Sequence, residues 1–213
     1  MRPPLARSMA RSPFILAHLT AAGLAACSSD APTAPRSAQT ASAPSASKAA
    51  PQPSVAKYEV YYMELTIDHH LAGIVEAQLC VERAIHPALR AMCQQSITSQ
   101  QQQIAQLRTW LREWYGIDYA GEIEQSALHD VRCLSALTGA AFEDEFLTDF
   151  SKHHVRIIKE SEKAVRTVYH EPLRALAQTI ITAQSQQVVT MQTWDCQWYG
   201  DCRQGLINQV EQS

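Results

Sequence analysis

The sequence lacks three features that would place it in other protein classes. It has no cluster of basic charge, since 18 Lys and Arg stand against 21 Asp and Glu for a formal net charge of −3. That balance argues against nucleic acid as a partner. No apolar run is long enough to span a membrane as a stable helix. No alternation of apolar and polar residues predicts β-strands. What remains is a helical pattern, carried by residues 56–213.

Two kinds of catalytic site are also missing. No Glu-x-x-His motif occurs in the expected helices, although ferritin-like di-metal oxidases carry two of them. No Ser or Cys stands with a matched base and acid in a recognisable nucleophilic arrangement. The sequence therefore predicts a protein that is not an enzyme.

The N-terminal part predicts a leader and a tether. Basic residues precede a short apolar run within residues 1–26, as in a secretory signal peptide. The residues from Leu24 to Cys27 resemble a bacterial lipobox, which implies a lipid on Cys27. Residues 27–55 are mainly Ala, Ser and Pro, so we expect a disordered tether. These features predict a cell-envelope protein attached to the membrane by its lipid, in the outer membrane facing the periplasm if the cell is Gram-negative.

The remaining chain contains one helical hairpin twice. A shift of 84 residues aligns the sequence with itself without a gap, over units of about 58–116 and 142–200. In each unit a proline marks the start of the second helix, and Gly116 or Gly200 marks its end. The pattern predicts an all-α fold, an up-down four-helix bundle made of two duplicated hairpins, with residues 117–140 as the crossover.

Polar residues recur on the apolar faces of these helices. In the first unit they are His69, His70, Glu76, Gln100 and Gln103, and in the second they are His153, His154, Glu160, Gln184 and Gln187. Counted from the hairpin tip, His70 lies sixteen residues before residue 86 and Gln100 fourteen after it. At about 1.5 Å rise per residue the two should lie within one turn of the same level, and so should His154 and Gln184.

Two interpretations of this set stay open. In the first, the four histidines and two glutamates are metal ligands and the four glutamines support them, since imidazole suits copper, zinc, iron or nickel. In the second, all these residues make internal contacts, and the protein is a structural or protein-interaction module of the envelope. The sequence names no protein partner. His86 and His170, just before the second helices, are expected to be turn and surface residues.

The cysteines that follow Cys27 predict disulfides, because an exported protein folds in an oxidising compartment. Cys80 lies six residues before the hairpin tip and Cys93 seven after it, so the two should face each other and pair. Cys133 can pair with either Cys196 or Cys202, and the sequence does not decide between them.

The combined pattern resembles the bacterial DUF305 family. That family has an adjacent His-His pair, a proline-marked turn into LRALA, and then Gln-x-x-Glu-Ile-x-x-Met leading to a Trp. This chain shows DHHLAGIVEAQ…HPALRAMCQQSITSQQQQIAQLRTW and KHHVRIIKESE…EPLRALAQTIITAQSQQVVTMQTW, within about residues 58–199. The resemblance implies an exported, ferritin-like four-helix bundle. It also implies copper or another transition metal as the cofactor, because some members bind copper in the periplasm through His and Met.

The chain departs from the family pattern in both halves. Glu76 and Glu160 stand where the family usually has Met, and Gln103 and Gln187 stand where it often has Glu. Because Cu(I) prefers soft thioether ligands, the loss of Met favours Cu(II) or a harder ion.

Overall fold

The computed structural model describes residues 50–202 and 205–211, which belong to one compact unit. The expected signal peptide, the lipidation site at Cys27 and the tether as far as residue 49 lie outside the described residues. The first helix begins at Pro53, so residues 53–55 are helical and do not belong to the tether.

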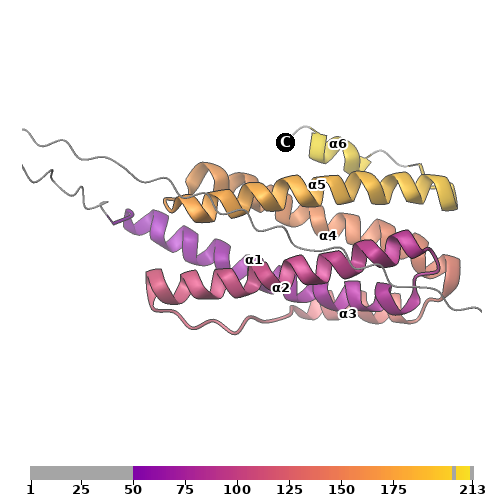
Figure 1. Cartoon of the computed structure of the whole chain (residues 1–213), viewed down its shortest axis with the longest axis horizontal. Coiled ribbons are helices and arrows are strands. Elements are labelled where there is room, and N and C mark those ends of the chain that lie inside the picture. The colour runs from indigo at the N-terminus through magenta and orange to yellow at the C-terminus, as the bar shows by residue number, and fades with distance from the viewer. Residues whose placement is uncertain (1–49, 203–204, 212–213) are drawn as a thin grey trace, which may run out of the picture. The chain divides into compact units, whose positions relative to one another are not determined.

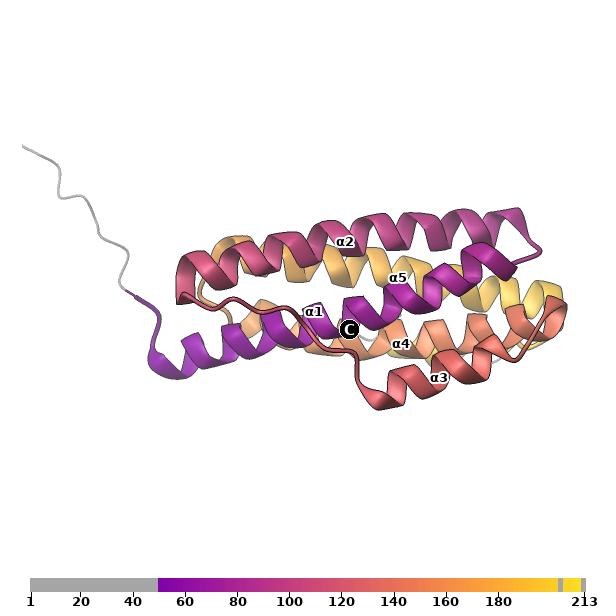
Figure 2. The same cartoon turned by 90° about the horizontal axis from the view of Figure 1, so that it is seen from below.

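Four long helices form the bundle, and two short helices lie on its outside (Figures 1 and 2). The long helices are α1 (Pro53–Arg83), α2 (Pro87–Tyr115), α4 (Gly139–Thr167) and α5 (Glu171–Tyr199). The short ones are α3 (Gln125–Ser135), which lies within the expected crossover, and α6 (Gly205–Glu211). The described residues contain no strand. The predicted four-helix bundle of two hairpins is confirmed.

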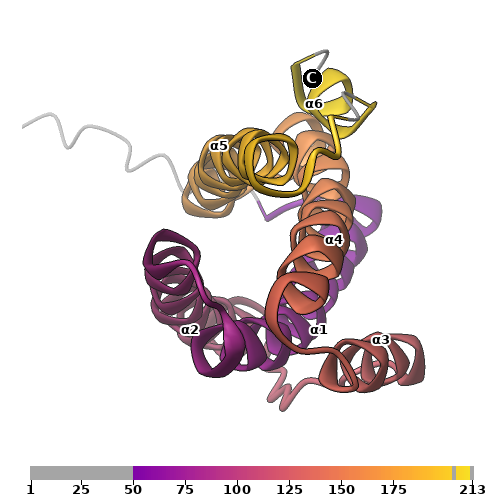
Figure 3. The same ribbon diagram turned by 90° about the vertical axis from the view of Figure 1, so that its right-hand side faces the viewer.

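The two hairpins pack as units and meet along a central pair of helices. α1 packs most closely against α2, and α4 against α5, while α1 and α4 join the two halves, as the end-on view shows (Figure 3). A hydrogen bond of 2.8 Å between the hydroxyls of Tyr62 and Ser161 crosses this central contact. The α1–α4 contact therefore carries the pseudo-twofold relation between the halves.

The ends of the helices follow the sequence signals. Pro87 and Pro172 occupy the first turns of α2 and α5, where a missing backbone N–H costs nothing. Gly116 and Gly200 end these helices with φ of 67° and 79°, the left-handed conformation that glycine adopts without strain. None of the described helices is apolar enough over sufficient length to cross a membrane.

The structure shows which cysteines form disulfides. Cys80 pairs with Cys93 across the tip of the first hairpin, as predicted, with their Cα atoms 6.2 Å apart. Cys196 pairs with Cys202 and closes the turn after α5. Cys133 is an exposed free thiol on α3.

Each end of the bundle is fastened by a buried glutamate that binds the hairpin turn of the other half. Glu59 of α1 accepts hydrogen bonds from the backbone N–H groups of Tyr169 and His170 at 2.7 and 2.8 Å. The His170 ring lies 2.8 Å from the same carboxylate, and the Tyr115 hydroxyl donates to it. His170 also stacks on Trp114 at 3.9 Å between ring centroids.

The equivalent cluster in the other half has the same composition. Glu143 accepts from the backbone N–H of His86 at 2.8 Å, contacts its ring at 2.5 Å, and accepts from the Tyr199 hydroxyl. His86 stacks on Trp198 at 3.8 Å. The two histidines are therefore turn residues, as expected. Their side chains are partly exposed, at 36% for His86 and 22% for His170, and each one also joins the two halves through a buried carboxylate, which the sequence did not predict.

These glutamates predict a loss of stability in acid. Burial raises the pKa of Glu59 and of Glu143, but the hydrogen bonds from tyrosine and histidine outweigh it and leave each pKa below its ordinary value. A carboxyl whose folded pKa is depressed contributes stability above its unfolded pKa, about 4.3 for glutamate, and loses it as the pH falls through the folded pKa. We expect unfolding in urea between pH 6 and 3 to show this loss. In the Glu59→Gln/Glu143→Gln variant the free energy of unfolding should depend less steeply on pH. A slope equal to that of the parent chain would show that these two glutamates do not cause the acid sensitivity.

Candidate metal centre

Four histidines meet near the middle of the bundle, where α1 and α4 cross. His69 and His153 occupy equivalent positions in the two halves and stack with ring centroids 3.7 Å apart. His70, His153 and His154 are buried, and His69 is partly buried. The structure thus brings histidines of both repeat units together at the α1–α4 contact.

The hydrogen bonds fix the tautomer of two of these rings. His69 Nε2 lies 2.9 Å from the backbone carbonyl of His153, which can only accept, so His69 carries its proton on Nε2. His154 Nε2 lies 2.9 Å from the Oε1 atom of Gln187, whose amide nitrogen donates to Ser96 at 2.9 Å. His154 is therefore also protonated on Nε2.

The remaining nitrogen of each of these rings is buried and has no partner of proper hydrogen-bond geometry, although the Phe150 backbone lies close enough to His154 to support its pKa. The atoms are Nδ1 of His69 and Nδ1 of His154. Each carries a lone pair, because the proton is on the other nitrogen. A ring held by a hydrogen bond at one nitrogen, with a free lone pair at the other, is the usual arrangement of a metal-ligating histidine.

The other two histidines also have unsatisfied ring nitrogens, although Nδ1 of His153 lies 3.5 Å from the Arg156 guanidinium. Both ring nitrogens of His70 and Nε2 of His153 are buried without a hydrogen-bond partner. Burial without a hydrogen bond costs an amide or imidazole on the order of 1–3 kcal/mol. The centre therefore holds several lone pairs or N–H groups that the protein itself does not satisfy.

The glutamine contacts differ from the register expected from the sequence. His154 binds Gln187 and not Gln184, because Gln187 lies seventeen residues after the hairpin tip, closer to the sixteen before it. The Oε1 atoms of Gln100 and Gln184 are buried without a partner. Gln103, the counterpart of Gln187, lies close enough to His70 to support its pKa, but the pair lacks the geometry of a proper hydrogen bond. The two halves thus depart from strict symmetry.

Burial keeps all four imidazoles neutral at physiological pH. Desolvation lowers the pKa of His70 and of His154 to about 4. It lowers those of His69 and His153 well below their ordinary value, with the neighbouring histidines adding to the effect. Since a metal ion binds only the neutral ring, no proton competes for these sites near neutral pH.

The two predicted carboxylate ligands occupy different environments. Glu76 is buried and approaches the other half, with Oε1 3.4 Å from Nδ1 of His153. Burial raises the pKa of Glu76 to about 8, so its carboxyl is largely protonated at neutral pH. Glu160 is less buried and lines a surface cavity, and its Oε2 has no partner. Glu76 therefore lies against His153 of the second unit, not beside His69 on its own helix.

Gly73 lies on the same flank of α1 as His69 and Glu76, and the sequence assigned it no role in the centre. A Cβ atom at this position would lie 2.8 Å from Nε2 of His153 and 2.9 Å from Oε1 of Gln100. Any larger residue would push both groups away, so the helix needs glycine here. An isolated glycine within a helical pattern is the signal that could have revealed it.

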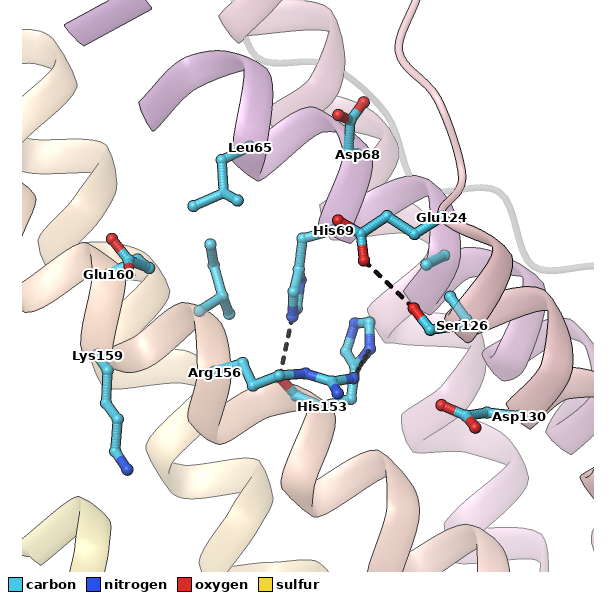
Figure 4. Close-up of a pocket in the computed structure, with 13 residues that line it drawn as sticks. Leu65, Asp68, His69, Glu124, Ser126, Asp130, His153, Arg156, Lys159 and Glu160 are labelled. Carbon is cyan, nitrogen blue, oxygen red and sulfur yellow. Dashed lines mark hydrogen bonds between the residues drawn. The ribbon is translucent and has the colours of Figure 1, made fainter. Parts of the chain in front are cut away.

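A cavity connects the histidines to the surface (Figure 4). It has a volume of about 440 Å³, and His69 and His153 lie in its wall. Its acidic lining residues are Asp68, Glu124, Asp130 and Glu160, and its basic ones are Arg156 and Lys159. Asp68 also holds the crossover in place, since it accepts from the Tyr119 hydroxyl and the Glu122 backbone N–H, both at 2.7 Å. The excess of carboxylates favours the approach of a cation.

The six predicted ligands do not form a closed coordination shell in this structure. Among the described residues, no three of them bring ligand atoms within 4.8 Å of one another; the group that does so consists of three aspartates elsewhere. Metal binding at the histidines would therefore require rotation of side chains. The donor types and the unsatisfied ring nitrogens nevertheless suit a transition metal.

Comparison with known proteins shows the family of the chain. The family model "Domain of unknown function (DUF305)" matches residues 59–195. The chain belongs to the DUF305 family. The match covers both hairpins and all four histidines of the centre. None of the curated proteins matches the sequence.

Solved structures of the protein CopM share the fold. CopM in the Cu(II)-bound form superposes with a TM-score of 0.60 at 21% identity, over 66% of this chain and 97% of CopM. The Cu(I)-bound form gives the same values, and the apo form gives a TM-score of 0.58 at 21% identity, over 66% of this chain and 98% of CopM. At this identity the likeness shows a common helical bundle.

Proposed function

We propose that this DUF305 protein is a non-enzymatic metal-binding protein of the cell envelope, and that its histidine centre takes copper, in the Cu(II) state. The observation that carries the proposal is the pair of buried, unpartnered Nδ1 atoms on His69 and His154. Each of these rings is fixed by a hydrogen bond at Nε2, so its lone pair is oriented in advance.

The choice of metal rests on ligand chemistry and on the relatives. Four neutral imidazoles and two carboxylates form a nitrogen and oxygen set that suits Cu(II), zinc or nickel, and copper binds most strongly along the first-row series. CopM, which shares the fold, has been solved with Cu(II), with Cu(I) and with silver. The absence of Met at the positions of Glu76 and Glu160 favours Cu(II) over Cu(I).

A second function competes with this one. In the chain of hydrogen bonds from His154 through Gln187 to Ser96, the histidine is an internal contact between helices. If all four histidines serve such contacts, the protein is a structural or interaction module without metal. His70, with both ring nitrogens unpartnered, argues against that reading.

The proposed location follows from the N-terminal sequence. Residues 1–26 act as a lipoprotein signal peptide, Cys27 carries the lipid, and the Ala/Ser/Pro-rich segment holds the bundle at a distance from the membrane. In a Gram-negative cell the bundle then faces the periplasm from the outer membrane. Radiolabelled palmitate incorporation that is lost in Cys27→Ala would test the anchor.

Metal uptake by the purified full chain tests the function. The protein is stripped with a chelator and titrated with Cu(II) by calorimetry, and the bound metal is counted by elemental analysis. We expect the parent chain to bind Cu(II) and the His69→Ala/His153→Ala variant to bind it about 100-fold or more weakly. Loss of a residue that only supports a ligand already lowers metal affinity 10–100-fold. Electron paramagnetic resonance should show nitrogen ligation that the variant loses.

An exposed histidine supplies the matched control. His129 lies on α3 with its side chain 66% exposed, so His129→Ala removes one imidazole without touching the centre and should leave Cu(II) binding unchanged. Absence of stoichiometric Cu(II) binding, or equal binding by the double variant, would overturn the proposal and leave the structural module. Preferential uptake of Zn(II) over Cu(II) would overturn the choice of metal.

A further inference from the structure

The crossover between the two hairpins is fastened to α1 at both of its ends. At its start the carboxylate of Asp68 accepts from the Tyr119 hydroxyl and from the Glu122 backbone N–H, both at 2.7 Å. At its end Arg83 donates to two backbone carbonyls at and just after the end of α3, at 2.6 and 2.9 Å. These contacts fix where the crossover begins and where it returns to the bundle.

The middle of the crossover is held much less firmly. No hydrogen bond or ion pair in the described part of the chain joins residues 123–134 to α1 or α4. The one buried residue of α3 is Leu134, near its C-terminal end. Segments with few buried apolar contacts and few hydrogen bonds to their surroundings move at low cost in free energy. Residues 123–134, which we call the strap, are therefore the part of the crossover best able to move.

The strap forms one wall of the cavity that leads to the histidine centre, and a basic side chain lies on another wall. Asp130 of the strap and Arg156 of α4 both line this cavity. The guanidinium of Arg156 reaches toward His153 and lies 3.5 Å from its Nδ1 atom (Figure 4). In the described part of the chain the Lys and Arg side chains that pair with carboxylates are those of Lys152 and Arg174. Arg156 and Asp130 thus line the same cavity without forming an ion pair.

The two charges are close enough to meet after a small movement. Both act on one buried carboxyl, since burial raises the pKa of Glu76, Arg156 lowers it and Asp130 raises it. Arg156 is exposed, and its side chain has many rotamers. A change of rotamer, together with a shift of the strap, would carry the guanidinium from His153 to Asp130.

The contact that holds Arg156 away from the strap depends on the state of His153. A guanidinium can only donate, so Nδ1 of His153 accepts this long hydrogen bond. His153 can no longer accept from Arg156 once it ligates a metal ion through either nitrogen. Its Nδ1 atom is then either the ligand atom or the atom that carries the ring proton. The positive charge at the centre also repels the guanidinium.

We propose, on the basis of the metal-binding function above, that Arg156 couples occupancy of the histidine centre to closure of the strap. In the metal-free protein Arg156 contacts His153, and the cavity is open. When the centre is occupied, Arg156 leaves His153 and pairs with Asp130, which draws the strap over the cavity. Closure shields the histidines from solvent and slows the release of the metal.

Hydrogen–deuterium exchange of the full chain, followed by mass spectrometry, tests this coupling. Protein that has been stripped with a chelator is compared with protein that has been loaded with Cu(II). We expect the backbone amides of residues 123–134 to exchange about two- to fivefold more slowly in the loaded protein, the range that corresponds to one exposed ion pair. All measurements use the Cys133→Ser background, because Cys133 is a free thiol on α3 and thiolates bind copper themselves.

Three charge variants make the test specific. Asp130→Asn and Arg156→Gln should each still bind Cu(II) but lose the copper-dependent protection of the strap. Arg156→Gln should bind Cu(II) at least as tightly as the parent chain, because it removes a positive charge beside the centre. Lys159→Gln is the matched control, since Lys159 also lines the cavity but its ammonium binds Gln209 at 2.8 Å. It should keep the protection.

The possible failures are distinguishable. Cu(II) binding with no change in the exchange of residues 123–134 would overturn the coupling and leave the proposed function intact. Copper-dependent protection that persists in both Asp130→Asn and Arg156→Gln would also overturn it, because the strap would then close without this ion pair. Absence of Cu(II) binding to the parent chain would overturn the proposed function, and the coupling with it.

Discussion

Replacement of Glu143 by alanine is expected to lower the free energy of unfolding by about 3 kcal/mol, because its carboxylate is the acceptor for several polar groups and each buried group left without a partner costs about 1–3 kcal/mol. The glutamate is fully buried and accepts from the His86 backbone and the Tyr199 hydroxyl, and its carboxylate contacts the His86 ring. Its removal leaves these polar groups without an acceptor inside the bundle. Glu59→Ala should cost a similar amount, because it occupies the equivalent place at the other end.

Chemical denaturation of the two variants against the parent chain measures this effect. Glu82→Ala is the matched control, since Glu82 is an exposed glutamate on α1 and its loss should change stability by no more than about 0.5 kcal/mol. The two clusters share no residue, so the double variant should lose roughly the sum of the single losses. A loss at Glu143 no larger than that at Glu82 would show that the clusters do not hold the two halves together.

Replacement of His70 by leucine is expected to have opposite effects on stability and on metal binding. Both ring nitrogens of His70 are buried without a partner, so no hydrogen bond offsets their desolvation penalty. An apolar side chain of similar size removes that penalty. In metal-free buffer the free energy of unfolding should rise by about 1–2 kcal/mol. Copper binding should weaken at least tenfold, because one imidazole is lost. Urea denaturation and Cu(II) titration of the same preparation measure both effects.

His154→Leu is the informative comparison. It occupies the equivalent position but removes a real hydrogen bond and leaves the Oε1 atom of Gln187 unpaired. It should therefore destabilise the metal-free protein by about 1–3 kcal/mol while also weakening copper binding. If His70→Leu were as destabilising as His154→Leu and copper binding were unaffected, the histidines would be internal contacts and the structural module would be the better reading.

Much of the fold was predictable because its signals are local or repeated. The 84-residue repeat, the prolines that open α2 and α5, and the glycines that end them fix four helices and their order. The pairing of Cys80 with Cys93 followed from counting residues on either side of one turn. The crossover helix α3 was not assigned from the sequence, although its bounds lie inside the expected crossover.

Contacts between the two halves could not be predicted by counting residues from a turn. Glu59 meets His170 across 111 residues of sequence, and Glu143 meets His86 across 57. The repeat aligns Glu59 with Glu143 and Tyr115 with Tyr199, so it marks these residues as equivalent. It does not say that each glutamate binds the turn of the opposite half. That follows only once α1 packs against α4 and the turns are brought to the ends of the partner helices.

The sequence by itself determined that this protein is a duplicated helical bundle with two histidine pairs on its inner faces, because apolar periodicity and internal repetition are properties of the chain. The tertiary structure decided which histidine nitrogens are free. His69 donates a hydrogen bond to a backbone carbonyl of the opposite half, and His154 donates one to Gln187. His70 makes neither kind of hydrogen bond. The two halves are equivalent in sequence, but their rings pack against each other across one interface. The hydrogen bonds that each ring makes depend on this packing, which the sequence alone does not specify.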